Sequence, residues 1–189
     1  MCIRDSSWYR SLWEKQVGTA VVPAHADLTG YQLVVVPHLY LADESLVARL
    51  TSFAEAGGTV VVTYFSGIAN QDDHIHLGGY PGAFRDLLGV RVEEFAPVLP
   101  GDTIHLDGDV VGGSSAEASG WSEPVGLVDA EARATYVDGP SVGWPAISRA
   151  ARGAGAAWYV TTDLSDAARV GLGDRRDPRS RERQGPPHS

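Results

Sequence analysis

The segment of residues 57–82 holds side chains whose types could do chemistry. An apolar run, TVVVTY, leads into a stretch with Ser66, two aspartates and two histidines. A serine directly after a strand is typical of a hydrolase nucleophile elbow, which requires Gly-x-Ser-x-Gly so that the backbone can turn tightly. Tyr64 and Ile68 stand where those glycines should be. The elbow pattern therefore fails, but a Ser66-dependent hydrolase stays open as the weakest hypothesis, because triad partners need not be close in sequence.

The same segment contains residue types that bind metal ions. In DDHIH, residues 72–76, the side chains of His74 and His76 would share one side of an extended chain, with two carboxylates beside them. A zinc site needs at least three protein ligands, and no third ligand stands at a supporting spacing. A polar surface loop is the favoured interpretation.

The glycines of GAGAAW, residues 153–158, match two of the three in a dinucleotide-binding fingerprint. They come before an apolar run, whereas the fingerprint follows a strand and opens a helix. This order favours a hairpin turn. Taken alone, the residues predict no catalytic, cofactor-binding or metal-ligating site and no cofactor.

Composition narrows the class of protein. The 15 basic residues are outweighed by 24 acidic ones, which gives a formal charge of -9 and argues against a nucleic-acid groove or an anionic membrane surface. The single cysteine, Cys2, excludes an internal disulfide framework. No apolar run approaches the ~18 residues of a membrane span, and the first residues lack the apolar core of a signal peptide. We expect a cytoplasmic protein with neither nucleic-acid nor membrane partners.

The elements that would position these residues alternate in the first half of the chain. Periodicity, caps and apolar runs predict them as follows: a helix over 8–17, a short strand over 19–23, a strand over 33–37, a helix that Asp43 caps and Gly57 and Gly58 stop, a strand over 59–64, a short helix over 81–88 and a strand over 90–95. Such alternation predicts right-handed crossovers onto a parallel sheet.

The pattern changes after Pro97. Short alternating segments separated by Gly-, Ser- and Asp-rich turns predict antiparallel hairpins packed onto the edge of the sheet. Residues 112–122, GGSSAEASGWS, are predicted to form a low-complexity loop.

Several stretches resemble one known family. They are YRSLW (9–13), DLTGYQLVVVP (27–37), AGGTVVVTYFSG (56–67), GGYPGAFRDLLGV (78–90) and GAAWYVTT (155–162). Together they resemble the trimerisation domain of bacterial β-galactosidases of glycoside hydrolase family 42, over roughly residues 8–166. The resemblance makes a non-catalytic trimerisation domain the favoured hypothesis. A domain that binds small molecules or sugars through the loops after the strands remains an alternative.

The resemblance implies a flavodoxin-like fold, similar to class I glutamine amidotransferases but without their catalytic cysteine. It also implies that two glutamates of a preceding (β/α)8 barrel hydrolyse terminal β-D-galactosides with retention. Such a barrel takes about 200 residues or more, so this 189-residue chain cannot hold one beside the domain. We therefore expect no catalytic residue here, self-association as a homotrimer, and the catalytic barrel of the parent chain as a second partner.

The expected fold class is α/β: a flavodoxin-like, doubly wound parallel sheet with appended antiparallel β-hairpins. Family members carry a strand before the helix that matches YRSLW, so the first strand is expected to be missing. The opening MCIRDS resembles translated sequencing-adapter sequence, so residues 1–7 are predicted to be a non-native leader. Residues 8–168 are predicted to be the domain, and residues 169–189, rich in arginine and proline, a disordered tail.

Overall fold

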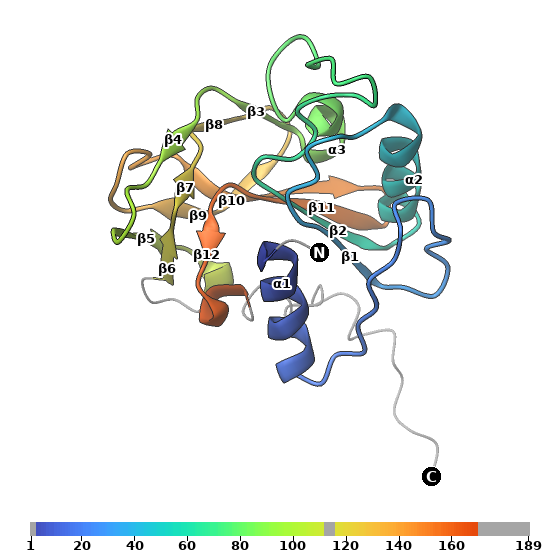
Figure 1. Ribbon diagram of the computed structural model, residues 1–189, viewed down its shortest axis with the longest axis horizontal. Helices are drawn as coiled ribbons and strands as arrows, with labels where there is room; N and C mark the ends of the chain where they lie inside the picture. The colour runs from blue at the N-terminus through green and yellow to red at the C-terminus, as the bar shows by residue number, and fades with distance from the viewer. Residues whose placement is uncertain (1–2, 112–115, 170–189) are drawn as a thin grey trace.

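One mixed sheet of eight strands organises residues 3–111 and 116–169, the part of the chain that the computed structural model describes (Figure 1). In order across the sheet the strands are β1 (Leu33–Val36), β2 (Thr59–Thr63), β11 (Gly155–Val160), β10 (Pro145–Arg152), β9 (Glu131–Tyr136), β5 (Thr103–Asp107), β6 (Ala116–Ser119) and β12 (Asp163–Leu164). β1, β2 and β11 are parallel, and all other neighbours pair antiparallel. The α/β class is confirmed, and so are a parallel unit, formed by β1, β2 and β11, and antiparallel strands that extend it.

The third parallel strand is β11, where the sequence predicted residues 90–95. β3 (Val90–Val92) instead pairs with β8 (Val125–Leu127) in a separate two-stranded ribbon. Its residues are buried, exposed and buried in turn, with Arg91 outward, which suits a ribbon that has one covered face. The β11 run is mostly buried on both faces, as a strand inside a sheet requires.

The predicted hairpins are present and continue the sheet from β11. β9, β10 and β11 form consecutive antiparallel pairs, so the turn predicted for residues 153–158 is confirmed at its start. The predicted loop over 112–122 is wrong from residue 116 onward, because β6 and β7 (Trp121–Ser122) occupy it, and β7 pairs with β4 (Ala96–Pro97). Small residues still form strands there, since ladder hydrogen bonds use the backbone. Residues 112–115 lie outside the described residues.

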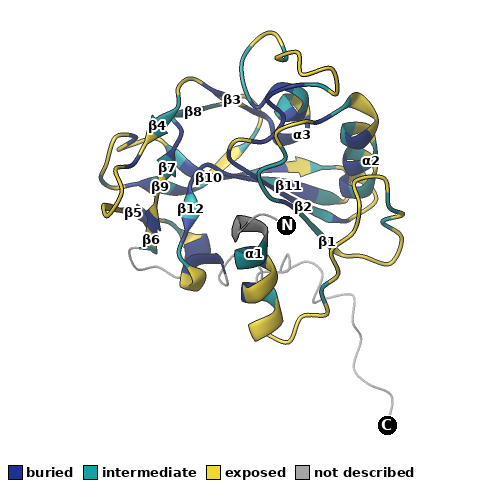
Figure 2. Ribbon diagram, viewed as in Figure 1, coloured by how far each residue is buried: buried dark blue, intermediate teal, exposed yellow. Residues whose placement is uncertain are grey.

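Helices cover the two faces of the sheet (Figures 1 and 2). One apolar core joins the sheet to α2 (Glu44–Glu55), η1 (Gly82–Phe84) and α3 (Arg85–Leu88). The other core takes in α1 (Ile3–Glu14), through Trp8, and η2 (Asp109–Val111). The helices of the described chain are too short to span a bilayer.

The ends of the domain differ in part from the sequence predictions. Residues 19–23 form no strand, and Val21 is 71% exposed. Among the described residues β1 pairs with β2 alone, so residues 19–23 add no strand to the free edge of β1. Residues 3–7 of the predicted leader belong to α1. Arg169 forms ion pairs with Asp163 and Asp166, and residues 170–189 of the predicted tail lie outside the described residues.

The predicted N-cap of α2 is confirmed, and it yields a stability prediction. Asp43 Oδ1 accepts the backbone N–H of Leu46 at 2.7 Å, which satisfies a donor that the helix itself cannot. We expect Asp43→Ala to lower the free energy of unfolding by about 1 kcal/mol, and Asp43→Ser, which retains a capping oxygen, to change it by much less. Urea denaturation of the three chains measures both effects, and equal losses in the two variants would contradict the capping role.

Candidate functional site at the carboxyl ends of the parallel strands

The segments that follow β1 and β2 meet at one end of the sheet, where open α/β folds place their ligands. The Oγ1 of Thr63, the last residue of β2, accepts the backbone N–H of His38 at 2.9 Å. Next to it, Ser66 Oγ accepts the backbone N–H of Leu39 at 3.0 Å. The side chains of Thr63 and Ser66 therefore link the carboxyl end of β2 to the loop that follows β1.

Ser66 is not placed as a nucleophile. Its side chain is fully buried and its oxygen is engaged with the loop after β1. The residue at the sharp turn out of β2 is Phe65, whose φ of 60° lies in the left-handed region, which is uncommon for a bulky residue. The backbone turns where a nucleophile elbow would carry a hydroxyl or a thiol, and here the residue at the turn carries a phenyl ring.

The structural role of Ser66 can be measured. We expect Ser66→Ala to lower the free energy of unfolding by roughly 1 to 3 kcal/mol, because a partly buried N–H loses its acceptor. The matched control is Ser148→Ala, since Ser148 is equally buried and its Oγ has no hydrogen-bond partner. Chemical denaturation of both variants decides the matter: if Ser148→Ala costs as much as Ser66→Ala, the hydrogen bond to Leu39 is not the cause.

Glu123 is the carboxyl group at the centre of this site. It is fully buried, and three donors from different elements converge on it. The Tyr159 hydroxyl donates to Oε2 at 2.6 Å, while the indole N–H of Trp121 at 3.0 Å and the backbone N–H of Phe65 at 3.3 Å donate to Oε1. Within the described residues it joins no ion pair. Burial raises the pKa of Glu123 to about 7, although the three hydrogen bonds oppose the shift.

Two buried tyrosines lie beside this carboxyl. Burial raises the pKa of Tyr159 well above its usual value, and the nearby Glu123 adds to the rise. Tyr136, whose pKa burial also raises, has its hydroxyl 2.7 Å from Thr161 Oγ1. These groups connect β9, β11 and the segment before β8. Because both carboxyl oxygens are occupied inside the protein, Glu123 reaches no substrate from this position.

Sequence reasoning missed Glu123. Its neighbours in WSEPVGL are mostly apolar or small. A lone acidic residue in such a segment was the only feature of the sequence that could have indicated a buried carboxyl group. That signal was not sufficient, because the burial of Glu123 depends on residues 36 and 58 positions away.

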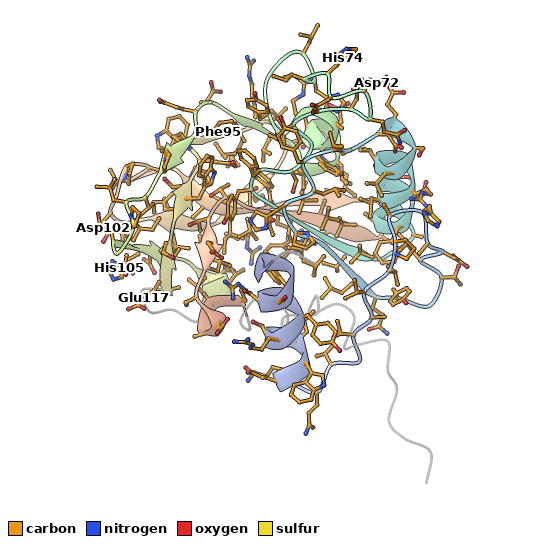
Figure 3. The ribbon with its side chains drawn as sticks, viewed as in Figure 1. Asp72, His74, Phe95, Asp102, His105 and Glu117 are labelled. Atoms are coloured by element: carbon orange, nitrogen blue, oxygen red, sulfur yellow. The ribbon has the colours of Figure 1, made fainter. Side chains whose placement is uncertain are left out.

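Five aromatic side chains pack against one another at the strand ends, and we name them the strand-end aromatic cluster. They are Tyr40, Phe65, Tyr80, Phe95 and Trp121, linked by ring centroid distances of 4.6 to 5.8 Å. Phe95 is labelled in Figure 3. Phe65 is 36% and Tyr40 38% exposed. Tyr64, by contrast, is a core residue stacked beneath Trp121 at 6.1 Å.

The acidic and histidine residues of the loop after β2 do not converge. Asp72 and His74 are exposed at the tip of the loop (Figure 3), whereas His76 Nε2 lies 3.1 Å from the Ala42 carbonyl oxygen. A pocket of about 420 Å³ beside them is lined by Asp43, Glu44, Ser45, Asn70, Gln71, Asp72 and His76. In the described chain, no three side chains of metal-binding type come together as a metal site would need.

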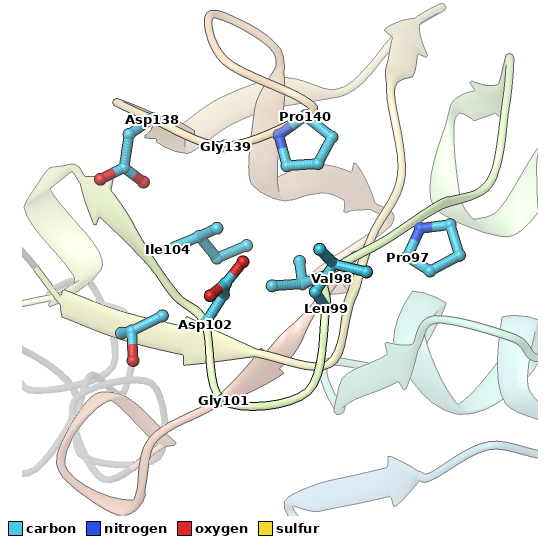
Figure 4. A pocket seen from close by; sticks show the side chains of 10 residues that line it. Pro97, Val98, Leu99, Gly101, Asp102, Ile104, Asp138, Gly139 and Pro140 are labelled. Carbon is cyan, nitrogen blue, oxygen red and sulfur yellow. The ribbon is translucent and has the colours of Figure 1, made fainter.

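The other pocket lies away from the strand ends, at the turns around β5 and after β9. It has a volume of about 500 Å³ and is lined by residues 97–99, 101–104 and 138–140 (Figure 4). At its margin Asp138 accepts both the backbone N–H of His105 at 2.7 Å and its ring Nδ1 at 2.6 Å. The two hydrogen bonds lower the pKa of Asp138.

Comparison with known proteins agrees with the architecture. A family model described as the β-galactosidase trimerisation domain matches residues 4–173. A β-galactosidase of Arthrobacter sp. is 46% identical over 156 residues, which are 82% of this chain and 22% of that protein. One from Geobacillus sp. is 36% identical over 160 residues, 82% of this chain and 23% of its own length.

Solved structures give the same result. A β-galactosidase from Rahnella sp. R3 matches with a TM-score of 0.85 and 33% identity, over 90% of this chain and 26% of that one. Another from Bacillus circulans sp. alkalophilus matches with a TM-score of 0.86 and 28% identity, over 89% and 26%. This chain thus spans about a quarter of such proteins or less. It belongs to the β-galactosidase trimerisation domain family of glycoside hydrolase family 42.

Proposed function

We propose that this chain assembles as a homotrimer and that, within its parent protein, it holds three catalytic barrels together. The observation that carries the proposal is the family match over residues 4–173, in a chain that spans 22% of its Arthrobacter relative. The half-exposed aromatic cluster supports it, because exposed apolar patches mark interaction surfaces.

Catalysis in the parent then belongs to its barrel, where two glutamates hydrolyse terminal β-D-galactosides with retention. The buried states of Ser66 and Glu123 support this division, since neither side chain is available to a substrate. We assign no catalytic, cofactor-binding or metal-ligating residue to this chain, and we place the parent protein in the cytoplasm. Residues 8–168 are proposed as the domain, together with the preceding residues that belong to α1.

We also infer a flavodoxin-like origin for the sheet, similar to the class I glutamine amidotransferases. Three features support it: β1, β2 and β11 are parallel, α2 crosses from β1 to β2 on one face, and the chain turns sharply at Phe65. The antiparallel strands from β10 onward extend this unit.

The test combines mass and activity. Sedimentation equilibrium of the purified 189-residue chain is expected to give the mass of three chains, and a chromogenic β-galactoside is expected to stay intact in its presence. A monomer at all concentrations would contradict the assembly role. Hydrolysis that survives further purification would contradict the assignment of catalysis to another part of the parent.

A further inference from the structure

The strand-end aromatic cluster combines exposure with a continuous apolar surface. A residue with a large ring carries roughly 150–250 Å² of surface, so the third or more of Phe65 and Tyr40 that remains open is a substantial apolar area. Leu41, next to Tyr40, adds a side chain that is 45% exposed. Each partner in a standard interface buries about 800 Å² of surface. The exposed parts of these side chains cover less than that, so they would form the apolar centre of the interface, and other residues would form the rest.

The cluster is also rigid before anything binds. The buried carboxyl of Glu123 accepts hydrogen bonds from the Trp121 indole and from the Phe65 backbone, which hold one ring of the cluster and the backbone that carries a second ring. Phe65 is held at a positive φ that a phenylalanine rarely adopts, and such strain is found mostly where function needs it. Prearranged rings lose little entropy on association, which favours binding.

We propose that the strand-end aromatic cluster is a contact surface for a second copy of this chain. The proposal rests on the proposed function and names its interface. Enclosed aromatic side chains surrounded by polar ones are the usual energetic centre of protein interfaces, and exposed Glu93 and Glu94, next to Phe95, provide such a polar rim. A second copy is the occupant because the family to which the chain belongs is defined by trimerisation.

The symmetry of a trimer specifies how the cluster is used. In a closed ring of three chains, each contact joins two different surfaces, so every cluster meets a different region of the next copy. Each trimer then contains three identical contacts. Loss of the cluster weakens all three at once, and monomers are expected instead of stable dimers.

The test is a double variant, Tyr40→Ser with Phe65→Asn. Asparagine tolerates a positive φ better than other side chains, and the backbone N–H that binds Glu123 is retained. We expect sedimentation to show a trimer for the unchanged chain, and for the variant at least a tenfold higher concentration for half-assembly. Far-UV circular dichroism and the thermal midpoint verify that the variant is folded.

The matched control is Val22→Asn with Tyr31→Ser. Both residues are 39% exposed, close to the exposure of Phe65 and Tyr40, but they precede β1 at the opposite end of that strand. This control is expected to remain trimeric. Leu41→Glu is a second probe that leaves all five rings in place and adds charge beside them, and it is expected to dissociate the trimer as well.

The outcomes separate this inference from the proposed function. If the unchanged chain is a trimer and both cluster variants remain trimers, the inference is wrong, and a different occupant, such as the catalytic part of the parent, covers the cluster. If the unchanged chain is a monomer, the proposed function fails and the inference with it. If the double variant unfolds, Leu41→Glu decides: a folded trimer with that substitution overturns the inference, and a folded monomer supports it.

Discussion

Glu123→Gln is expected to remove most of the pH dependence of stability between about pH 4.5 and pH 7. The pKa of Glu123 is raised from 4.5 to about 7 in the folded chain. Below pH 4.5 the carboxyl is protonated in both folded and unfolded chains. Between the two values the unfolded chain loses its proton while the folded chain retains it, so the folded state loses stability as the pH rises. Over this window the loss is on the order of 3 kcal/mol, because each pH unit between the two pKa values contributes about 1.36 kcal/mol.

Glutamine matches the size of the residue and cannot ionise. Its carbonyl oxygen can accept the hydrogen bonds from Trp121 and Phe65, and its amide can donate to the Tyr159 hydroxyl. The measurement is the free energy of unfolding in urea from pH 4.5 to pH 8.5 for both chains. The difference between them cancels the titration of all other groups. A difference that stays constant with pH would show that Glu123 is already ionised in the folded chain at pH 5, and the interpretation would be wrong.

Gly155→Ala is expected to destabilise the fold strongly, although it adds a single methyl group. A β-carbon at Gly155 would lie 2.1 Å from the backbone oxygen of Gly58 and 2.4 Å from that of Ala54. These oxygens belong to the end of α2 and the start of β2, and the Gly58 oxygen also accepts the backbone N–H of Ala156. The backbone cannot yield without breaking these contacts. We expect a loss on the order of 3 kcal/mol or more.

The control for crowding is Gly18→Ala. Gly18 has open space where its β-carbon would stand, and neither glycine has a positive φ, so the two substitutions differ in crowding and not in backbone strain. Thermal and urea denaturation are expected to show little change for Gly18→Ala and a large loss for Gly155→Ala. Similar losses in the two variants would be evidence against the close approach of β11 to α2.

The sequence predicted the elements whose causes are local. The α2 cap, its apolar stripe and the glycines after it lie within 16 residues, and the structure agrees at Asp43 and at Gly57. The hairpin at residues 153–155 was also predicted, since two glycines between apolar runs suffice for a turn. The prediction that failed most clearly, a strand at residues 19–23, treated a short apolar run as sufficient, although a strand needs a neighbour to hydrogen-bond with.

The sequence by itself determined α2, the short helix over residues 81–88, most of the strands, the failure of the Ser66 elbow and the resemblance to a trimerisation domain, because each depends on residue types at short spacing. Tertiary structure alone decided that β11 rather than β3 lies beside β2, and that Glu123 is buried among Tyr159, Trp121 and the backbone of Phe65. Both outcomes depend on contacts between residues far apart in the chain, such as Tyr159 with Glu123 and Phe65 with Glu123. The desolvation that raises the pKa of Glu123 exists only when these segments pack together.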